Sequence, residues 1–302
     1  MSTSASPAAI TTPVVTTAAN TAANTAVAAS TTAAQRPIGI FDSGIGGLTV
    51  ARAVARALPH ERLVYFGDTA HLPYGDKSTA AIQAYAVKIC DLLLRQQCKL
   101  ILIACHSASA AAYELVREYV GSKARVMNVI DPIVELVGQQ YAGRLVGLIG
   151  TKQTVNSNVY KKKIDGLDAG VDLRSLATPL LAPMVEEGFY NNSISGDIIA
   201  SYLRNPALAG IEALLLACTH YPLIQAQIEA YYNGRVAVLD PSNVVAATVH
   251  DYLHRHQLAA PTTEGAAPAH HFYVSDFTRS FEESTRLFFG QSVQLEHYPL
   301  WE

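Results

Sequence analysis

Two of the four cysteines, Cys105 and Cys218, are placed where chemistry is expected. Each follows directly on a short apolar run and is followed by a hydroxyl residue and a histidine, in the strings Cys-His-Ser and Cys-Thr-His. Ligands of parallel α/β sheets bind beyond the carboxyl ends of the strands, so both thiols are expected at a binding site. A cysteine that only fills the core is the ordinary alternative. We apply that interpretation to Cys90 and Cys98, whereas the matched placement of the other two favours function.

Two thiols that face each other across a cleft suit the inversion of a carbon centre, because one removes a proton while the other delivers one. A free cysteine has a pKa near 8.5, so only a few per cent is thiolate at neutral pH. A neighbouring carboxylate or imidazole can accept the thiol proton or hold the charge. Asp42 and His220 are the candidates for that work.

The Gly-rich loop at residues 42–47, Asp-Ser-Gly-Ile-Gly-Gly, stands between an expected strand and an expected helix. The dinucleotide-binding pattern would need a third glycine where Thr49 stands, and a carboxylate at the mouth of the loop would repel phosphate. The backbone N–H groups of such a loop can hold a substrate carboxylate instead. Ser43 and Thr151 can add hydroxyl donors.

Weaker signals come from residues 73–75, Pro-Tyr-Gly, and residues 186–188, Glu-Glu-Gly, which by themselves predict turns. Asp68, His71 and the remaining histidines are interpreted as surface or loop residues.

These residues need a scaffold of parallel βα units, which the alternation of apolar runs and amphipathic stretches predicts. Strands are expected at residues 37–41, 63–66, 100–104, 125–130, 145–149, 171–176, 213–217, 236–239 and 272–275. Helices are expected at residues 48–58, 79–96, 108–119, 194–203 and 277–289.

The second part of the chain repeats the order of the first, which indicates two related α/β domains with the site in the cleft between them. The first domain is expected to comprise residues 36–131 and 242–302, with a linker or loop at 258–269, and the second residues 132–241. The Ala- and Thr-rich residues 1–35 are predicted to be a disordered tail without the features of a signal peptide.

Composition excludes several classes of protein. In 302 residues, 50% are hydrophobic and 16% are charged, so a mostly disordered chain is excluded. The net charge of −3 argues against a nucleic-acid partner, and no apolar run is long enough to span a bilayer. The irregularly spaced cysteines predict free thiols in a reducing cytoplasm.

Several strings taken together resemble glutamate racemase, within the superfamily that also holds aspartate racemases. They are Gly-Ile-Phe-Asp-Ser-Gly-Ile-Gly-Gly-Leu at 39–48, Tyr-Phe-Gly-Asp-Thr-Ala at 65–70 with Pro-Tyr-Gly at 73–75, Ala-Cys at 104–105 with Ala-Ser at 108–109, Gly-Thr at 150–151 with Thr-Val at 154–155, Val-Glu at 185–186, and Leu-Ala-Cys-Thr-His-Tyr-Pro at 216–222. The resemblance spans residues 37–245 and leaves the tail and the C-terminal addition outside. It implies two facing α/β domains and cofactor-independent, metal-free interconversion of L- and D-glutamate, which supplies cell-wall D-glutamate. It also implies a cytoplasmic homodimer with a small-molecule substrate.

The resemblance assigns roles to individual residues. The implied acid and base residues are Cys105 and Cys218, with Asp42, Glu186 and His220 as their helpers. The implied substrate contacts are Asp42, Ser43, Tyr74, Gly75, His106, Ser107, Thr219 and His220.

One departure from the family pattern is His106-Ser107, where the family usually has Asn-Thr after the first cysteine. Serine keeps the hydroxyl, but histidine replaces an amide with a bulkier ring that titrates. We expect the contact of this position with substrate to change, and hypothesise that His106 lowers the pKa of the Cys105 thiol.

Three other interpretations of the same residues stay open. Cys105, His106, Cys218 and His220 are four zinc-capable side chains, although the short Cys-x₂₋₄-Cys spacing of paired zinc ligands is absent. A thiol hydrolase would use one Cys–His pair and leave the second cysteine unexplained. A non-catalytic amino-acid-binding protein could close two such domains around its ligand.

Overall fold

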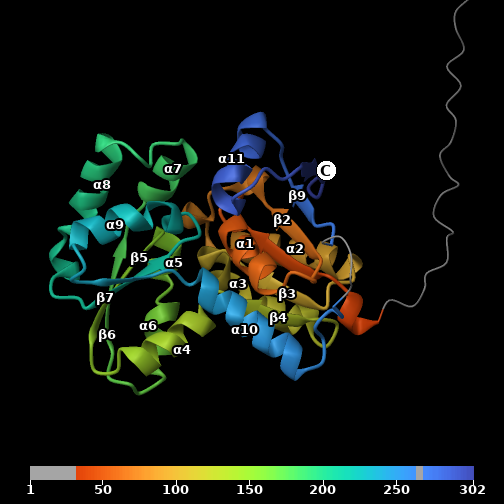
Figure 1. The fold of residues 1–302 in the computed structure, drawn as a ribbon, viewed down its shortest axis with the longest axis horizontal. Helices are drawn as coiled ribbons and strands as arrows, with labels where there is room; N and C mark the ends of the chain where they lie inside the picture. The colour runs from red at the N-terminus through yellow and green to blue at the C-terminus, as the bar shows by residue number, and fades with distance from the viewer. Residues whose placement is uncertain (1–31, 263–267) are drawn as a thin grey trace, which may run out of the picture. The chain divides into compact units, whose positions relative to one another are not determined.

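The computed structural model describes residues 32–262 and 268–302. The predicted tail at 1–35 and linker at 258–269 therefore lie partly outside the described residues. In the described part, the strands form two parallel sheets covered by helices, as predicted (Figure 1).

The first sheet has six strands in the order β10-β9-β2-β1-β3-β4. Its strands are β1 (Ile38–Asp42), β2 (Leu63–Gly67), β3 (Leu100–Ile103), β4 (Arg125–Asn128), β9 (His271–Val274) and β10 (Leu295–His297). All its pairings are parallel. Because β9 pairs with β2, the C-terminal segment extends the sheet that begins with β1.

The second sheet has four strands in the order β6-β5-β7-β8, again all parallel. Its strands are β5 (Leu145–Gly150), β6 (Asp172–Ala177), β7 (Ala213–Ala217) and β8 (Ala237–Leu239). In the first sheet, the loop after the central strand β1 leads into a helix, and the neighbouring strand β3 ends just before Cys105. In the second sheet, β5 and β7 have the same arrangement, and β7 ends just before Cys218. The strand order thus repeats, whereas the domain boundaries given above stay predictions.

The helices flank these sheets. They are α1 (Leu48–Ala57), α2 (Thr79–Arg95), α3 (His106–Val120), α4 (Asp131–Gln140), α5 (Lys152–Asn156), α6 (Val159–Asp165), α7 (Leu181–Glu186), α8 (Ser193–Leu203), α9 (Gln225–Tyr232), α10 (Ser242–Arg255) and α11 (Arg279–Phe289). Helix α3 begins two residues earlier than predicted because Cys105 caps it, its sulfur accepting the Ala108 N–H at 3.4 Å. Helix α11 begins two residues later than predicted, after the cap of Thr278 on the Phe281 N–H.

The central strands are buried along their whole length, as expected for parallel strands covered on both faces. Cys90 and Cys98 belong to this core. Burial raises the pKa of both thiols, that of Cys98 to about 12, so neither is a ready nucleophile at neutral pH.

A buried ion pair lies at the start of β3, inside the first sheet. Lys99 Nζ lies 2.6 Å from Glu61 Oε2, and both side chains are 2% exposed. Lys99 also donates to the carbonyls of Ala34 and Leu258, and Glu61 accepts the N–H of Ala260. Burial lowers the pKa of Lys99, and Glu61 offsets part of that effect. The pair ties two chain segments to β3.

A search of the described helices for one long and apolar enough to cross a bilayer finds none.

Candidate active site

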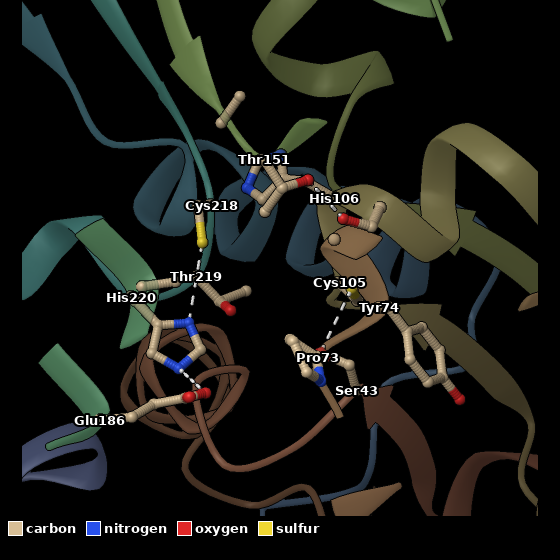
Figure 2. Close-up of a pocket in the computed structure, with 14 residues that line it drawn as sticks. Ser43, Pro73, Tyr74, Cys105, His106, Thr151, Glu186, Cys218, Thr219 and His220 are labelled. Carbon is tan, nitrogen blue, oxygen red and sulfur yellow. Dashed lines mark hydrogen bonds and ion pairs between the residues drawn. The ribbon is translucent and has the colours of Figure 1, made fainter. Parts of the chain in front are cut away.

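The carboxyl ends of both sheets contribute to one pocket (Figure 2). Its lining residues are Ser43, Pro73, Tyr74, Gly75, Cys105, His106, Ser107, Thr151, Ala182, Glu186, Ala217, Cys218, Thr219 and His220. Every predicted substrate-contact residue except Asp42 is among them. Both thiols line this single pocket, one from each sheet, and each cysteine is 6% exposed.

Cys218, His220 and Glu186 form a chain of polar contacts at one side of the pocket (Figure 2). Cys218 Sγ lies 3.7 Å from His220 Nδ1, and His220 Nε2 lies 2.9 Å from Glu186 Oε1. Burial disfavours the imidazolium, but the hydrogen bonds and charges of Cys218 and Glu186 outweigh it and raise the pKa of His220 well above its usual value. An imidazolium held here stabilises a thiolate on Cys218.

Cys105 has a different environment. Its thiol points to Ser43 Oγ at 3.7 Å, and its sulfur accepts the Ala108 N–H. Burial, and then the charge of Asp42, raises the pKa of Cys105 to about 12. At neutral pH this cysteine is a protonated thiol.

Asp42 lies beneath the Gly-rich loop and does not line the pocket. Its Oδ2 accepts the N–H groups of Gly44 and Gly47, at 3.2 and 3.0 Å. Its buried Oδ1 has no hydrogen-bond partner among the described residues. Burial raises the pKa of Asp42. Asp42 thus holds the Gly-rich loop through Oδ2, and its Oδ1 is free to accept a proton.

The Gly-rich loop also approaches the second sheet's cysteine segment closely. A Cβ at Gly46 would lie 2.5 Å from His220 Cε1 and 2.6 Å from Thr219 Oγ1. Thr49, in the first turn of α1, donates to the Thr219 carbonyl at 3.1 Å. Only glycine at position 46 leaves His220 its place beside Cys218.

Hydroxyl groups connect the two sheets on another side of the pocket. Ser107 Oγ lies 2.8 Å from Thr151 Oγ1 and 3.3 Å from Thr154 Oγ1. Thr151 caps α5 by accepting the N–H of Thr154. These side chains, which the sequence placed at two separate strand ends, therefore present hydroxyls to a shared space.

Comparison with known proteins agrees with this geometry. The family model described as Asp/Glu/Hydantoin racemase matches residues 47–249. The chain is 39% identical to the glutamate racemase of Chlorobaculum parvum over 257 residues, 85% of this chain and 93% of that protein.

The chain belongs to the Asp/Glu/hydantoin racemase family.

Other relatives extend the match. The glutamate racemase of Neisseria meningitidis is 37% identical over 260 residues, 86% of this chain and 95% of that protein. The crystal structure of the Francisella tularensis glutamate racemase in complex with D-glutamate superposes with a TM-score of 0.83 at 36% identity, and covers 89% of this chain and 99% of that one. The likeness therefore covers nearly all of the chain that the structure describes.

Within this family frame, the structure corrects the hypothesis about His106. The ring is buried, and its Nδ1 lies 2.7 Å from the hydroxyl of Tyr160. Burial lowers the pKa of His106 to about 3, so it is neutral at physiological pH. A neutral ring supplies no positive charge to Cys105, and the expectation that it lowers the thiol's pKa is wrong.

The zinc interpretation gains no support. In residues 32–262 and 268–302, no group of three or more His, Cys, Asp or Glu side chains is arranged to hold a metal ion. His106 faces Tyr160, and His220 is paired with Glu186.

The sequence missed two residues near the site. Tyr160 hydrogen-bonds His106 from α6, an element that the sequence analysis did not predict. Asp68, interpreted as a surface or loop residue, lies in the loop after β2 but is wholly buried beside Tyr74, so only the surface part of that interpretation is wrong. Its position directly after β2, at the carboxyl end of a parallel strand, was the signal that could have found it.

Proposed function

We propose that this protein is a glutamate racemase that interconverts L- and D-glutamate without a cofactor, by proton transfer at the α-carbon between Cys105 and Cys218. The observation that carries the proposal is that two buried thiols, one from each sheet, line one pocket. The names of the relatives provide the substrate.

The neighbours of the two thiols support complementary starting states for them in this proposal. The His220 imidazolium favours a thiolate at Cys218, which acts as the base and takes the α-proton. Cys105, with a pKa raised to about 12, is the thiol that delivers a proton to the opposite face. The turnover leaves Cys218 protonated and Cys105 as thiolate, which is the starting state for the reverse reaction. In this proposal Asp42, whose pKa is raised, helps Cys105 exchange its proton, which the electrostatic interaction between the two groups supports.

The remaining predicted residues hold the substrate in this proposal. Hydroxyls of Ser43, Ser107 and Thr219 donate to the substrate carboxylates, whereas the loop N–H groups of Gly44 and Gly47 are taken by Asp42. Tyr74 and Gly75 form the wall of the pocket beside them. His106, which is neutral, offers the substrate a hydrogen bond rather than a charge.

The wider setting of the enzyme follows from the family. We propose that it works as a cytoplasmic homodimer, and that its product D-glutamate enters peptidoglycan. The boundaries 36–131 with 242–302, and 132–241, are proposed for its two domains.

Chiral chromatography after incubation with L-glutamate or L-aspartate, in buffer without added cofactor or metal, tests the proposal. Rapid formation of D-glutamate, and much slower formation of D-aspartate, is the expected result. Cys105→Ser and Cys218→Ser are each expected to abolish racemisation, and Cys90→Ser, in the core, serves as the matched control. Binding of glutamate without turnover would favour a binding protein. Acylation of one cysteine by an ester substrate analogue would favour a thiol hydrolase. Either outcome would overturn the proposal.

A further inference from the structure

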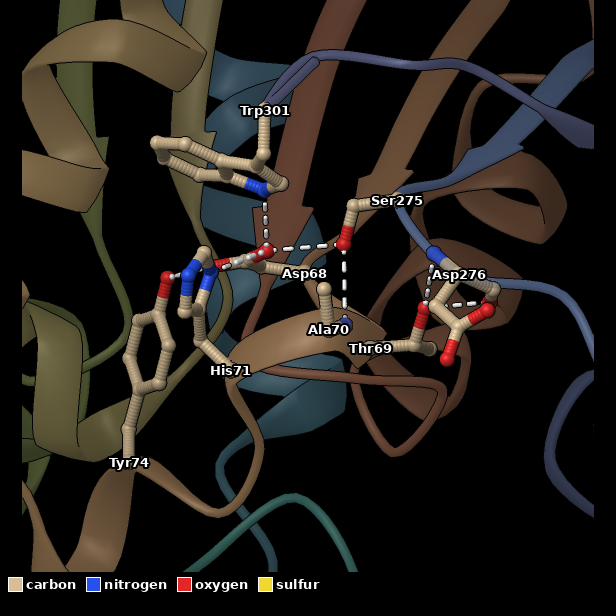
Figure 3. A network of polar contacts seen from close by, with 8 residues as sticks. All are labelled: Asp68, Thr69, Ala70, His71, Tyr74, Ser275, Asp276 and Trp301. Atoms are coloured by element: carbon tan, nitrogen blue, oxygen red, sulfur yellow. Dashed lines mark hydrogen bonds and ion pairs between the residues drawn. The ribbon is translucent and has the colours of Figure 1, made fainter.

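Asp68 is a buried carboxylate on which four side chains converge (Figure 3). Tyr74 donates its hydroxyl to Oδ2 at 2.6 Å, and Ser275 and the Trp301 indole each donate to Oδ1 at 2.8 Å. His71 Nδ1 lies 3.0 Å from Oδ2. A buried carboxylate needs such donors, since leaving one unpaired costs several kcal/mol. The donors come from two segments far apart in sequence.

Reciprocal hydrogen bonds fix the chain after β9 against the turn that carries Asp68 (Figure 3). Thr69 Oγ1 donates to the Asp276 carbonyl at 2.5 Å, and the Asp276 N–H donates back at 2.8 Å. The Ala70 N–H donates to Ser275 Oγ at 3.0 Å. The C-terminal segment is therefore joined to this turn by backbone as well as side chains.

Aromatic contacts hold Trp301 in place over the same turn. Its ring stands edge-on to His71 at 4.5 Å and to Tyr85 at 5.4 Å between ring centroids. Lys88 Nζ lies 4.7 Å from the centre of its ring. His71 in turn stacks on Tyr85 at 4.1 Å. The penultimate residue of the chain is thus fixed by its ring and by its N–H.

Tyr74 connects this cluster to the substrate pocket. Burial, and then the charge of Asp68, raises the pKa of Tyr74 well above its usual value, so the phenol stays a donor to Asp68. Tyr74 and the next residue, Gly75, both line the pocket. A Cβ at Gly75 would lie 2.8 Å from Thr151 Cβ, so this wall fits closely against the second sheet's half of the site. A small shift of the loop would change both the wall and that contact.

We propose that Trp301 and Asp68 are positioning residues, through which the C-terminal end of the chain sets the place of Tyr74 and Gly75 in the substrate pocket. The inference rests on the proposed function, because its principal readout is turnover of glutamate. Neither Cys105 nor Cys218 hydrogen-bonds this cluster among the described contacts. The cluster therefore acts on substrate binding and leaves proton transfer unchanged.

Steady-state kinetics of Trp301→Phe provide the test, because phenylalanine keeps one aromatic ring but removes the indole N–H donor with the rest of the indole. KM for glutamate is expected to rise about tenfold, the effect of losing a hydrogen bond to a charged group, with kcat within about twofold. Asp68→Asn is expected to raise KM further. Tyr298→Phe is the matched control, because the Tyr298 ring packs on Phe66 and Tyr273 in the same C-terminal segment. It is expected to keep the wild-type KM.

Trp301 also reports on the cluster directly, since it is the only tryptophan in the chain. Saturable change of its fluorescence on titration with glutamate is expected in the wild-type enzyme and in Tyr298→Phe. Tyr74→Phe removes the hydroxyl that donates to Asp68. Where calorimetry shows that this variant still binds glutamate, the fluorescence of Trp301 is expected to stay unchanged during the titration.

Two results would overturn the inference. One is a wild-type KM in Trp301→Phe, and the other is an equal rise of KM in Trp301→Phe and Tyr298→Phe, which would mean a general packing effect. Wild-type protein that does not racemise glutamate would instead refute the proposed function, so the two failures are distinguishable.

Discussion

Replacing Glu186 by glutamine tests whether the imidazolium of His220 activates Cys218. In the wild-type protein, His220 Nε2 lies 2.9 Å from Glu186 Oε1. A glutamine amide keeps an oxygen that can accept from this nitrogen but lacks the negative charge of the carboxylate. A hydrogen bond to a charged group is worth about 1.5–3 kcal/mol, and the 25% exposure of Glu186 favours the lower part of that range. Because the hydrogen bond and charge of Glu186 are among the causes of the raised pKa of His220, that pKa is expected to fall in Glu186→Gln.

The sign of the effect follows from the direction of the shift. The folded-state pKa of His220 is raised, so the stabilisation that its charge provides is full below about pH 6.5 and is lost as the pH rises through the folded-state pKa. In Glu186→Gln that loss occurs at lower pH. Less imidazolium at neutral pH means less thiolate on Cys218.

Two measurements quantify the loss. The rate of alkylation of Cys218 by iodoacetamide at pH 7, read by peptide mass spectrometry, is expected to fall about tenfold, and kcat/KM about 10- to 100-fold. The fall in kcat/KM must be equal from L- and D-glutamate, because enantiomers have equal free energies. Glu187→Gln, an exposed neighbour, is the matched control and should change neither quantity. Unchanged alkylation and turnover in Glu186→Gln would refute the reasoning.

Three further predictions concern the loop, the second thiol and the scaffold. Gly46→Ala should push the imidazole away from its thiol and lower kcat at least about tenfold, whereas Gly196→Ala, in open space on α8, should keep activity and raise stability by about 0.5–1 kcal/mol in thermal unfolding. Asp42→Asn removes a charge that raises the pKa of Cys105, so alkylation of Cys105 at pH 8 should become faster; an unchanged rate would contradict that electrostatic role. Lys99→Met leaves a buried carboxylate unpaired and should lower the free energy of unfolding by about 3–5 kcal/mol, measured by urea denaturation; a loss below about 1 kcal/mol would show the ion pair to be unimportant.

The sequence predicted the sheets well because buried parallel strands are continuous apolar runs bounded by polar residues. The run at 213–217 is predicted without error, and the others agree to within one or two residues. Several elements were missed. Helices α5 and α7, with 5 and 6 residues, and strand β10, with 3, are too short to show a periodicity. The longer helices α4 and α10, with 10 and 14 residues, were missed as well.

The site was predictable where position along a strand determined it. Cys105 and Cys218 follow strands that belong to two separate sheets, and the parallel geometry brings both to one pocket. The position of Asp68 after β2 offered the same signal, but its partners were not predictable in this way, because Ser275 and Trp301 stand 207 and 233 residues further along the chain.

His106 shows a second limit of sequence reasoning. A histidine beside a cysteine suggests a charge that lowers the thiol's pKa. That outcome depends on solvation, and the fold buries this ring against Tyr160 and keeps it neutral. Whether a titratable residue is charged depends on tertiary burial, which spacing along the chain does not encode.

The central claim is that two thiols act on opposite faces of one carbon, and the first turnover in D₂O tests it most directly. L-glutamate is converted to a small extent, and the isotopic content of product and recovered substrate is measured by mass spectrometry after chiral separation. Two-base chemistry predicts D-glutamate that carries one deuterium at the α-carbon, and recovered L-glutamate that carries none. Product that retains the substrate's own α-proton, or deuterium in recovered substrate at the same rate as in product, would mean that one base serves both faces and would contradict the account.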